Sequence, residues 1–321
     1  MLMPRFGVSV FCVGLAVLGA DVASGQNYPN KPIRIVTAEF GGGGDVVARI
    51  IGQGLTASLG QQVIVDNRGG NAVIPAEITA KAPSDGYTLL VAGNTHWIFP
   101  LLQTVPYDPI RDYSPITLTT SSPAVLAVAP AVPANSVKEL IALAKARPGI
   151  LNYASGVDGS TTHLAPELFK AMAGINVVRI TYKGATSAMI ALSAGEVQMM
   201  IFPTSTGTPY IKSGRVRALA VASAQPSALA PGLPTVAASG LPGYEAGTLH
   251  AVFAPAKTPK AIINLLNQEI VRFINTPNAK EKLFNAGLEI VGSSPEQSAV
   301  IIKSEMNRLG KVIKDAGIRA D

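Results

Sequence analysis

The sequence predicts an α/β fold with two domains and a ligand cleft between them. Strand-like runs alternate with amphipathic helical segments from Ile33 to Val291, the pattern of mostly parallel sheets covered by helices. The chain has 321 residues, which is long for one hydrophobic core, so we expect two. Two glycine turns, at 40–45 and 156–163, each follow a strand-like run and precede a helix. Such turns in separate α/β units predict that the two domains close on one small ligand, each contacting it through its glycine turn.

The first domain is predicted from both ends of the chain, as residues 26–125 plus 250–321. Its strands are expected over 33–37, 62–65 and 87–91, with helices after residue 45 and over 74–82. The apolar segment 112–129 has few helix formers and predicts strands that lead into the second domain. A strand-like run at 244–256 returns the chain, and Ser294-Pro-Glu-Gln297 opens a last helix that buries Ile301 and Ile302.

The second domain is predicted to span 126–249. Ser136-Val-Lys-Glu139 is a capping box that opens its first helix. Strands are expected over 151–154, 177–181, 197–202 and 216–223, with helices after residue 163 and over 187–194. The first of these two helices should bury Leu164, Leu168, Phe169 and Met172.

The N-terminus predicts export. Arg5 precedes an apolar run that ends near Ala20, and small residues follow, as in a secretory signal peptide over residues 1–25. An uncleaved anchor is the alternative. The only cysteine, Cys12, lies in this leader behind the bulky Phe11, a poor context for lipid attachment. We therefore expect a periplasmic, lipid-free monomer without disulfides.

The net charge of +6 does not indicate nucleic-acid binding. The basic residues are scattered singly and few aromatic residues lie among them. A positive field of this kind would help to collect anions. We expect no nucleic-acid partner.

The two glycine turns predict an anion site, because glycine lets the backbone approach a ligand and helix N-termini favour negative charge. The first turn has no Gly-Lys-Ser/Thr sequence, which argues against a nucleotide, and Asp45 is expected to cap its helix. The ligand-binding candidates in the two turns are Glu39, Phe40, Gly41, Gly42, Gly43, Gly44, Gly156, Ser160, Thr161 and Thr162.

Further candidates follow two other strands. Asn94, Thr95 and His96 come after the third strand of the first domain, and Phe202 and Thr204 follow a strand of the second. Phe40, Trp97 and Phe202 all follow strand ends and predict an aromatic-lined pocket. Three histidines, His96, His163 and His250, follow no metal-ligand spacing, so neither a metal nor a cofactor is expected.

A hydrolase is the competing class of function. Asp158-Gly-Ser160 with His163 lacks the Gly-x-Ser-x-Gly pattern, and a histidine three residues after the serine on one helix cannot act as its base. We therefore expect a binding protein and not an enzyme.

Several phrases, in order along the chain, resemble the periplasmic substrate-binding proteins of tripartite tricarboxylate transporters, the Bug family. They include Tyr28-Pro-x-Lys-Pro-Ile-Arg34, Asp45-Val-Val-Ala-Arg49, Asp66-Asn-Arg68, Asp85-Gly-Tyr-Thr-Leu-Leu90, Ser160-Thr-Thr-His-Leu164 and Tyr182-Lys-Gly184. The resemblance implies a Venus-flytrap fold, like that of type II periplasmic binding proteins. It also implies a small carboxylate held by amides, hydroxyls and water, and delivery to a permease of one large and one small subunit. A sensor that presents the same domain to a membrane kinase is the alternative role.

The chain departs from the family pattern at the first turn. An acid stands at Glu39, an aromatic at Phe40, and Gly44 replaces a hydroxyl residue. In the second domain Phe202-Pro203 replaces an Asp-Asn pair, so an acid is lost. These changes favour an aromatic or flat carboxylate over an aliphatic one.

Overall fold

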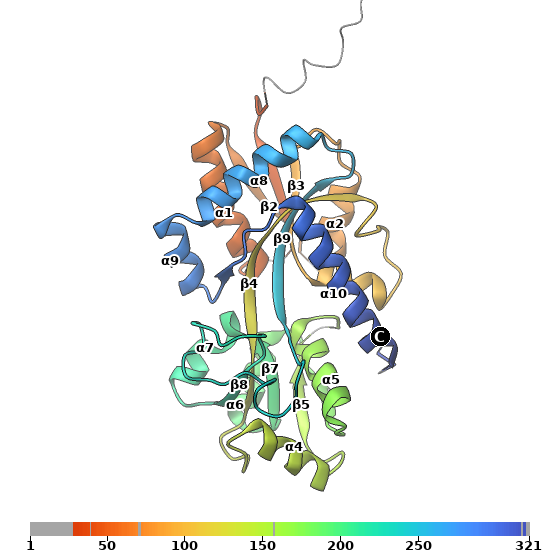
Figure 1. Cartoon of the computed structure of the whole chain (residues 1–321), viewed down its shortest axis with the longest axis vertical. Coiled ribbons are helices and arrows are strands. Elements are labelled where there is room, and N and C mark those ends of the chain that lie inside the picture. The colour runs from red at the N-terminus through yellow and green to blue at the C-terminus, as the bar shows by residue number, and fades with distance from the viewer. Residues whose placement is uncertain (1–27, 39, 70–71, 157, 316, 319–321) are drawn as a thin grey trace, which may run out of the picture.

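The computed structural model describes residues 28–318 except 39, 70–71, 157 and 316. Two lobes are stacked along the long axis and joined by two strands, β4 (Tyr113–Val128) and β9 (Gly247–Pro255) (Figure 1). The predicted α/β fold is confirmed. The predicted signal peptide at 1–25, and the candidate residue Glu39, lie outside the described residues.

The upper lobe in Figure 1 is built from both ends of the described chain. Its elements are β1 (Ile33–Thr37), α1 (Gly43–Leu59), β2 (Val63–Asn67), α2 (Val73–Ala80), β3 (Thr88–Gly93), α3 (Thr95–Ile98), the 3-10 turn η1 (Phe99–Leu101), α8 (Lys260–Ile274), α9 (Pro277–Asn285), β10 (Glu289–Ile290) and α10 (Pro295–Asp315). Strands β1, β2 and β3 are parallel, and β9 lies antiparallel between β3 and β4. Apolar side chains pack against both faces of this sheet and form two core clusters.

The lower lobe is continuous in sequence. Its elements are α4 (Val137–Ala146), β5 (Asn152–Ser155), α5 (Thr161–Ala173), β6 (Val178–Thr181), α6 (Ala185–Ala194), β7 (Met199–Pro203), α7 (Thr204–Lys212) and β8 (Arg217–Val221). Strand β5 pairs in parallel with β6 and β7, and the second half of β4 pairs with β7 and β8. One core cluster fills this lobe.

Strand β4 belongs to both lobes. Up to Pro123 it pairs with β9 of the upper sheet, and from Ala124 it pairs with β7. This change of partner at Pro123–Ala124 lies close to the predicted boundary, and the division into 26–125 with 250–321 and 126–249 stays a prediction. The expected strands of 112–129 are therefore one strand.

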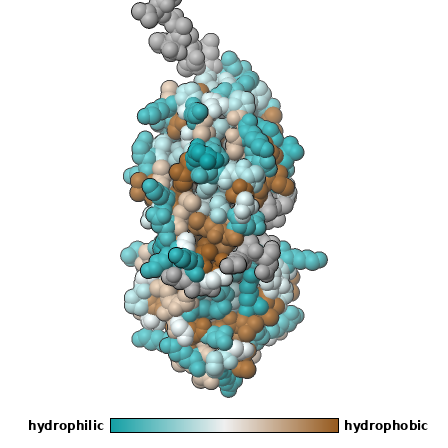
Figure 2. Space-filling model, turned by 90° about the vertical axis from the view of Figure 1, so that its right-hand side faces the viewer, coloured by the Kyte–Doolittle hydropathy of each residue, from teal (hydrophilic) through white to brown (hydrophobic). Residues whose placement is uncertain are grey.

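The lobes also touch beside the two strands. Leu164 of α5 packs into an upper-lobe cluster, and a side chain on Gly159 would collide with Phe99 at 2.8 Å. The Thr204 hydroxyl donates to the Gly287 carbonyl over 3.1 Å. Figure 2, from the side of α5 and α10, shows hydrophobic side chains gathered at the waist between the lobes.

Some details differ from the sequence prediction. Both predicted helix starts carry a serine N-cap: Glu139 N–H donates to Ser136 Oγ at 3.2 Å, and Gln297 N–H to Ser294 Oγ at 3.2 Å. Met172 is 39% exposed and Ile301 38% exposed, so neither is buried as expected, because each lies at the edge of its helix's apolar face. Helices α7 and α9 were not predicted.

Candidate functional site

A cleft of about 1000 Å³ opens between the lobes, large enough for a small organic ligand. Upper-lobe residues on its wall are Phe40, Gly41, Gly42, Gly43, Val46, Ala286 and Leu288. Lower-lobe residues are Lys183, Gly184, Ala185, Thr186, Ser187, Ile190, Pro203, Ser205 and Thr206. The joining strands supply Ser122, Thr248 and His250. None of these described lining side chains is acidic.

Three helices begin at this wall. Helix α1 follows β1, α6 follows β6, and α7 follows β7, so each starts at the carboxyl end of a strand. The first N–H groups of a helix have no partner within it, and its dipole favours an anion there. The cleft is therefore built to hold a negatively charged group.

Asp45 holds the first turn in place. Its carboxylate accepts from Gly41 N–H at 2.9 Å and from Asn67 Nδ2 at 2.9 Å, and it pairs with Arg49 Nε at 2.9 Å. Burial raises the pKa of Asp45, but the hydrogen bonds from Arg49, Gly41 and Asn67 outweigh it and keep the pKa below the usual value. Gly42 and not Asp45 takes the capping position of α1. Asp45 thus braces the turn from within the helix.

Two of the glycines in this turn leave room for neighbouring side chains. An ideal Cβ on Gly43 would lie 2.7 Å from His250 Nε2, so a side chain there meets the buried imidazole. A Cβ on Gly44 would lie 3.1 Å from Thr37 Oγ1. Thr37 Oγ1 thus lies beside the space that a side chain on Gly44 would fill, and neither residue lines the cleft.

The second predicted turn lies behind the cleft wall. Gly156 N–H donates to Thr162 Oγ1 over 2.9 Å, and the hydroxyls of Ser160 and Thr162 are 2.9 Å apart. Thr161 Oγ1 lies 2.7 Å from Thr248 Oγ1 on β9, which joins the lobes. A Cβ on Gly156 would press on Ala185 N at 3.3 Å, so this turn supports the start of α6.

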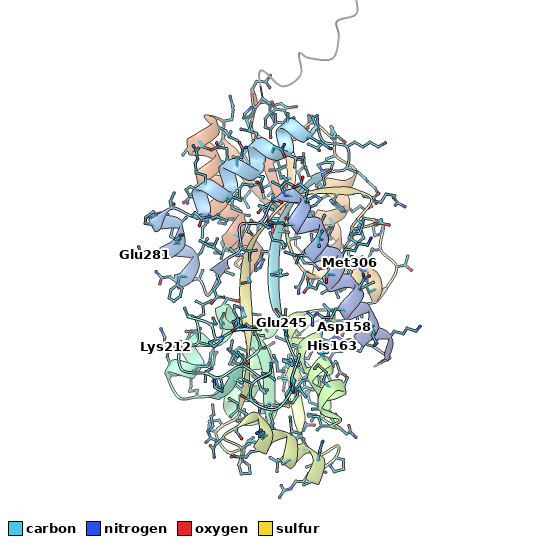
Figure 3. All side chains as sticks on the ribbon, viewed as in Figure 1. Asp158, His163, Lys212, Glu245, Glu281 and Met306 are labelled. Atoms are coloured by element: carbon cyan, nitrogen blue, oxygen red, sulfur yellow. The ribbon has the colours of Figure 1, made fainter. Side chains whose placement is uncertain are left out.

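A partly buried ion pair fixes the base of the second turn. Arg179 Nη2 lies 2.5 Å from Asp158 Oδ1 and donates to the Gly156 carbonyl over 3.3 Å. His163 Nδ1 accepts a hydrogen bond from Gly159 N–H at 3.2 Å. Burial is the main cause that lowers the pKa of His163 to about 4, and the positive charge of Arg179 adds to it. Asp158 and His163 lie together at the start of α5 (Figure 3). His163 is therefore neutral and structural.

A third turn, Lys183–Ser187, faces the cleft and was missed as a ligand candidate. Gly184 N–H donates to Ser187 Oγ over 3.2 Å, which closes the first turn of α6. Lys183 is the one cation among the described lining residues. The sequence does contain a pattern that could have identified this turn, since a strand, a glycine and a helix follow one another here as they do in the first two turns.

The structure corrects the aromatic pocket. His96 is fully buried against Tyr107, Tyr113 and Phe253, and burial lowers the pKa of His96 to about 3. Trp97 is buried in the same cluster. Phe202 lies under α7, where a Cβ on Gly207 would meet its ring.

Only Phe40 of the three predicted aromatics lines the cleft, and its side chain is 77% exposed. Asn94 donates to the Gly247 carbonyl at 3.1 Å and, like Thr95, is not on the cleft wall. Thr204 lies beneath the wall, between Ser122 and Gly287.

The three histidines lie in different places, one in the aromatic cluster, one at α5 and one on β9. Among the described residues, no three histidine, cysteine, aspartate or glutamate side chains converge in a metal-binding group. No helix in the described part of the chain is long and apolar enough to cross a membrane.

The comparisons with known proteins agree with this geometry. Residues 47–318 match the model of the tripartite tricarboxylate transporter family receptor. The chain belongs to this family. It is 37% identical to a protein in the tcbD-tcbE intergenic region of Pseudomonas sp. (strain P51), over 92% of this chain and 89% of that one. It is 35% identical to Protein BugT of Bordetella pertussis, over 96% of this chain and 97% of that one.

Solved structures support the same assignment. An R. palustris protein, Rpa4515, solved with adipate, superposes with a TM-score of 0.81 at 35% identity, over 91% of this chain and 99% of that one. The chain is thus a receptor of the tripartite tricarboxylate transporter family, and the predicted resemblance is confirmed. It is not an enzyme, since the family consists of receptors.

Proposed function

We propose that this receptor binds a straight-chain dicarboxylate in the cleft between its lobes. One carboxylate accepts from the first N–H groups of α1, and the other pairs with Lys183 at the start of α6. The observation that carries the proposal is the cleft wall itself. Three helix N-termini and one cation face it, and none of its described side chains is acidic.

Apolar side chains on opposite walls support a ligand with a carbon chain. Phe40 belongs to the upper lobe and Ile190, 54% exposed, to the lower lobe. Apolar surface exposed inside a binding cleft favours an apolar ligand body. Because Trp97 and Phe202 are in the core, the basis for preferring an aromatic ligand is reduced. Adipate, the ligand of the R. palustris relative, is therefore the first probe.

The family supports a proposal for the cellular role. We propose that the chain works in the periplasm as a monomer, with residues 1–25 removed, and delivers its ligand to the permease subunits of a tripartite transporter. Mass spectrometry of the periplasmic fraction should find an N-terminus near residue 26 and no lipid on Cys12. Uptake of labelled adipate, lost on deletion of this gene, distinguishes transport from sensing.

Calorimetry tests the ligand assignment. Adipate should bind, and hexanoate, which has the same chain length and one carboxylate, should bind more weakly. Lys183→Ala should weaken the binding of adipate by roughly 1–3 kcal/mol and should change the binding of hexanoate little, because only the second carboxylate of adipate loses a charged partner. Lys212→Ala is the matched control, since Lys212 is exposed on α7 and does not line the cleft. Equal losses for both ligands would refute the dicarboxylate assignment.

A further inference from the structure

His250 lies at the back of the cleft, where α1 meets the joining strands. It is paired with Gly93 of β3 and Thr120 of β4 across the upper sheet. The residue is 4% exposed and yet belongs to the cleft wall. A largely buried imidazole therefore presents one edge to the ligand site.

The absence of a side chain on Gly43 leaves space beside that edge. His250 Nε2 and Cε1 are the atoms nearest to an ideal Cβ on Gly43, at 2.7 and 3.0 Å. Gly43 does not have a positive φ, so its backbone conformation suits any residue. The glycine is needed for space, because anything larger would cover Nε2 at the first residue of α1.

The other ring nitrogen is already engaged. His250 Nδ1 lies 3.3 Å from Thr120 Oγ1. Burial lowers the pKa of His250 to about 4 and is the only cause of the shift, so the ring is neutral at pH 7.

The charged groups around this ring are few. The elements packed against it contribute Gly93, Thr120 and Gly43, none of which titrates. Asp45, two residues further along α1, is already paired with Arg49. Lys183 lies on the lower-lobe wall of the same cleft.

We propose that His250 contacts the bound carboxylate through the opening at Gly43 and takes up a proton from solvent as the ligand binds. This rests on the proposed function, because the anion is the carboxylate held at α1. A carboxylate next to Nε2 stabilises the imidazolium, since opposite charges at close range favour the charged form. In the protonated ring both nitrogens donate, one to Thr120 and one to the ligand. Capture of the ligand is thereby coupled to pH.

The sign of the coupling follows from linkage. The pKa of His250 is higher in the complex than in the free protein, so affinity rises as pH falls through the value in the complex. Between pH 7.5 and 5.5 we expect adipate to bind roughly three- to fivefold more tightly to the wild type than the ligand's own titration allows. His250→Gln keeps a polar side chain of similar reach but does not titrate in this range.

Calorimetry of the full mature chain with adipate provides the test. Titrations at pH 5.5 and 7.5, each in two buffers of different ionisation enthalpy, give the number of protons taken up. The wild type should take up a fraction of a proton at pH 5.5 that His250→Gln does not. Comparison with this variant cancels titration of the ligand itself.

A second measurement guards against a variant that fails to fold. The NMR titration of the His250 ring in the wild type should show its pKa rising when adipate is added. Proton uptake that is equal in wild type and His250→Gln, or a ring titration that adipate leaves unchanged, would overturn the proton coupling while leaving the binding function intact. A wild type that binds no carboxylate would overturn both proposals.

Discussion

The indole Nε1 of Trp97 donates a hydrogen bond of 2.7 Å to Glu305 Oε2, and so ties α3 to the C-terminal helix α10. Asn94 Nδ2 lies between Glu305 Oε1 at 3.4 Å and the Gly247 carbonyl at 3.1 Å. Arg308, one turn further along α10, donates to the Glu245 carbonyl over 3.0 Å. Glu245, next to β9 in Figure 3, lies where the chain returns from the lower lobe. The last helix therefore clamps the point at which the two lobes join.

Glu305 should make stability depend on pH. Burial raises the pKa of this carboxyl above its usual value, although the hydrogen bonds from Trp97 and Asn94 oppose the rise. Because the pKa of Glu305 is higher in the folded protein than in the unfolded chain, the stabilising contribution of Glu305 is present at low pH. That contribution is lost as the pH rises through the pKa in the folded protein. Glu305→Gln should therefore gain stability relative to wild type at pH 7.5, and the difference should shrink towards pH 4.5. Urea unfolding at both pH values measures it, and a variant equally destabilised at both would contradict the prediction.

Gly43→Val should weaken ligand binding by at least about 1–3 kcal/mol. The reason is steric, because the new side chain meets His250 and covers the amides of the α1 turn. Gly69→Ala is the matched control, since a Cβ there meets nothing within 4 Å. Adipate calorimetry on both variants, with melting temperatures as a check on folding, decides the matter. Full affinity in Gly43→Val would exclude the turn from the site.

Thr162→Val should destabilise the second turn by about 1–3 kcal/mol, because the Gly156 N–H loses its acceptor inside the protein. Ser160→Ala should leave ligand affinity nearly unchanged, because the Ser160 hydroxyl lies behind the cleft wall, 2.9 Å from that of Thr162. Denaturant unfolding and calorimetry separate the two effects. A loss of affinity in Ser160→Ala without a loss of stability would place this turn at the ligand, and the reverse would make it a support.

Asp45→Asn should destabilise the protein by about 1–3 kcal/mol at pH 7, because the charge that holds Arg49 is lost and Gly41 N–H has a weaker acceptor. The lowered pKa of Asp45 means that its contribution is present above the unfolded value and is lost as pH falls through the folded value. The variant and the wild type should therefore approach each other in stability as the pH falls from 7 towards 3. A gap that stays constant down to that pH would contradict this role.

Glu39, outside the described residues, retains its prediction from the sequence. A second acid at the mouth of the turn would repel a bare carboxylate, so the sequence leaves three placements for Glu39: it points to solvent, it pairs with a base such as Arg34 or Lys183, or it accepts a hydrogen from a hydroxyl, amine or protonated acid on the ligand. In the third placement, Glu39→Gln should weaken binding by about 1–2 kcal/mol. Tighter binding by this variant would instead make Glu39 a filter against anions.

The first turn shows how far local sequence could lead. A strand, four glycines and an amphipathic helix define its shape, and Gly41 to Gly43 do line the cleft. The N-caps at Ser136 and Ser294 are equally local, and both form. Such features depend on hydrogen bonds between residues a few positions apart.

The errors arose where distant segments decide the outcome. His96 and Phe202 follow strand ends, but one is covered by residues of β4 and β9 and the other by α7. Gly207 and Pro209 have low helix propensity, so the sequence does not predict α7. In the fold, Gly207 leaves room for the Phe202 ring. His250 was not chosen, because nothing near it in sequence shows that Gly43 packs against it. These contacts depend on strand order, which periodicity does not reveal.

The position of β9 also constrains the order in which the chain can be assembled after export. β9 lies between β3 and β4, so the upper sheet has a gap until residues 247–255 have emerged from the membrane. The lower lobe is continuous in sequence and can fold from residues already delivered, whereas β1, β2 and β3 emerge early and must wait. A chain that crosses the membrane from its N-terminus therefore exposes its first three strands, with an open edge, for longest. The N-terminal third is therefore the segment that a periplasmic chaperone would need to bind for longest.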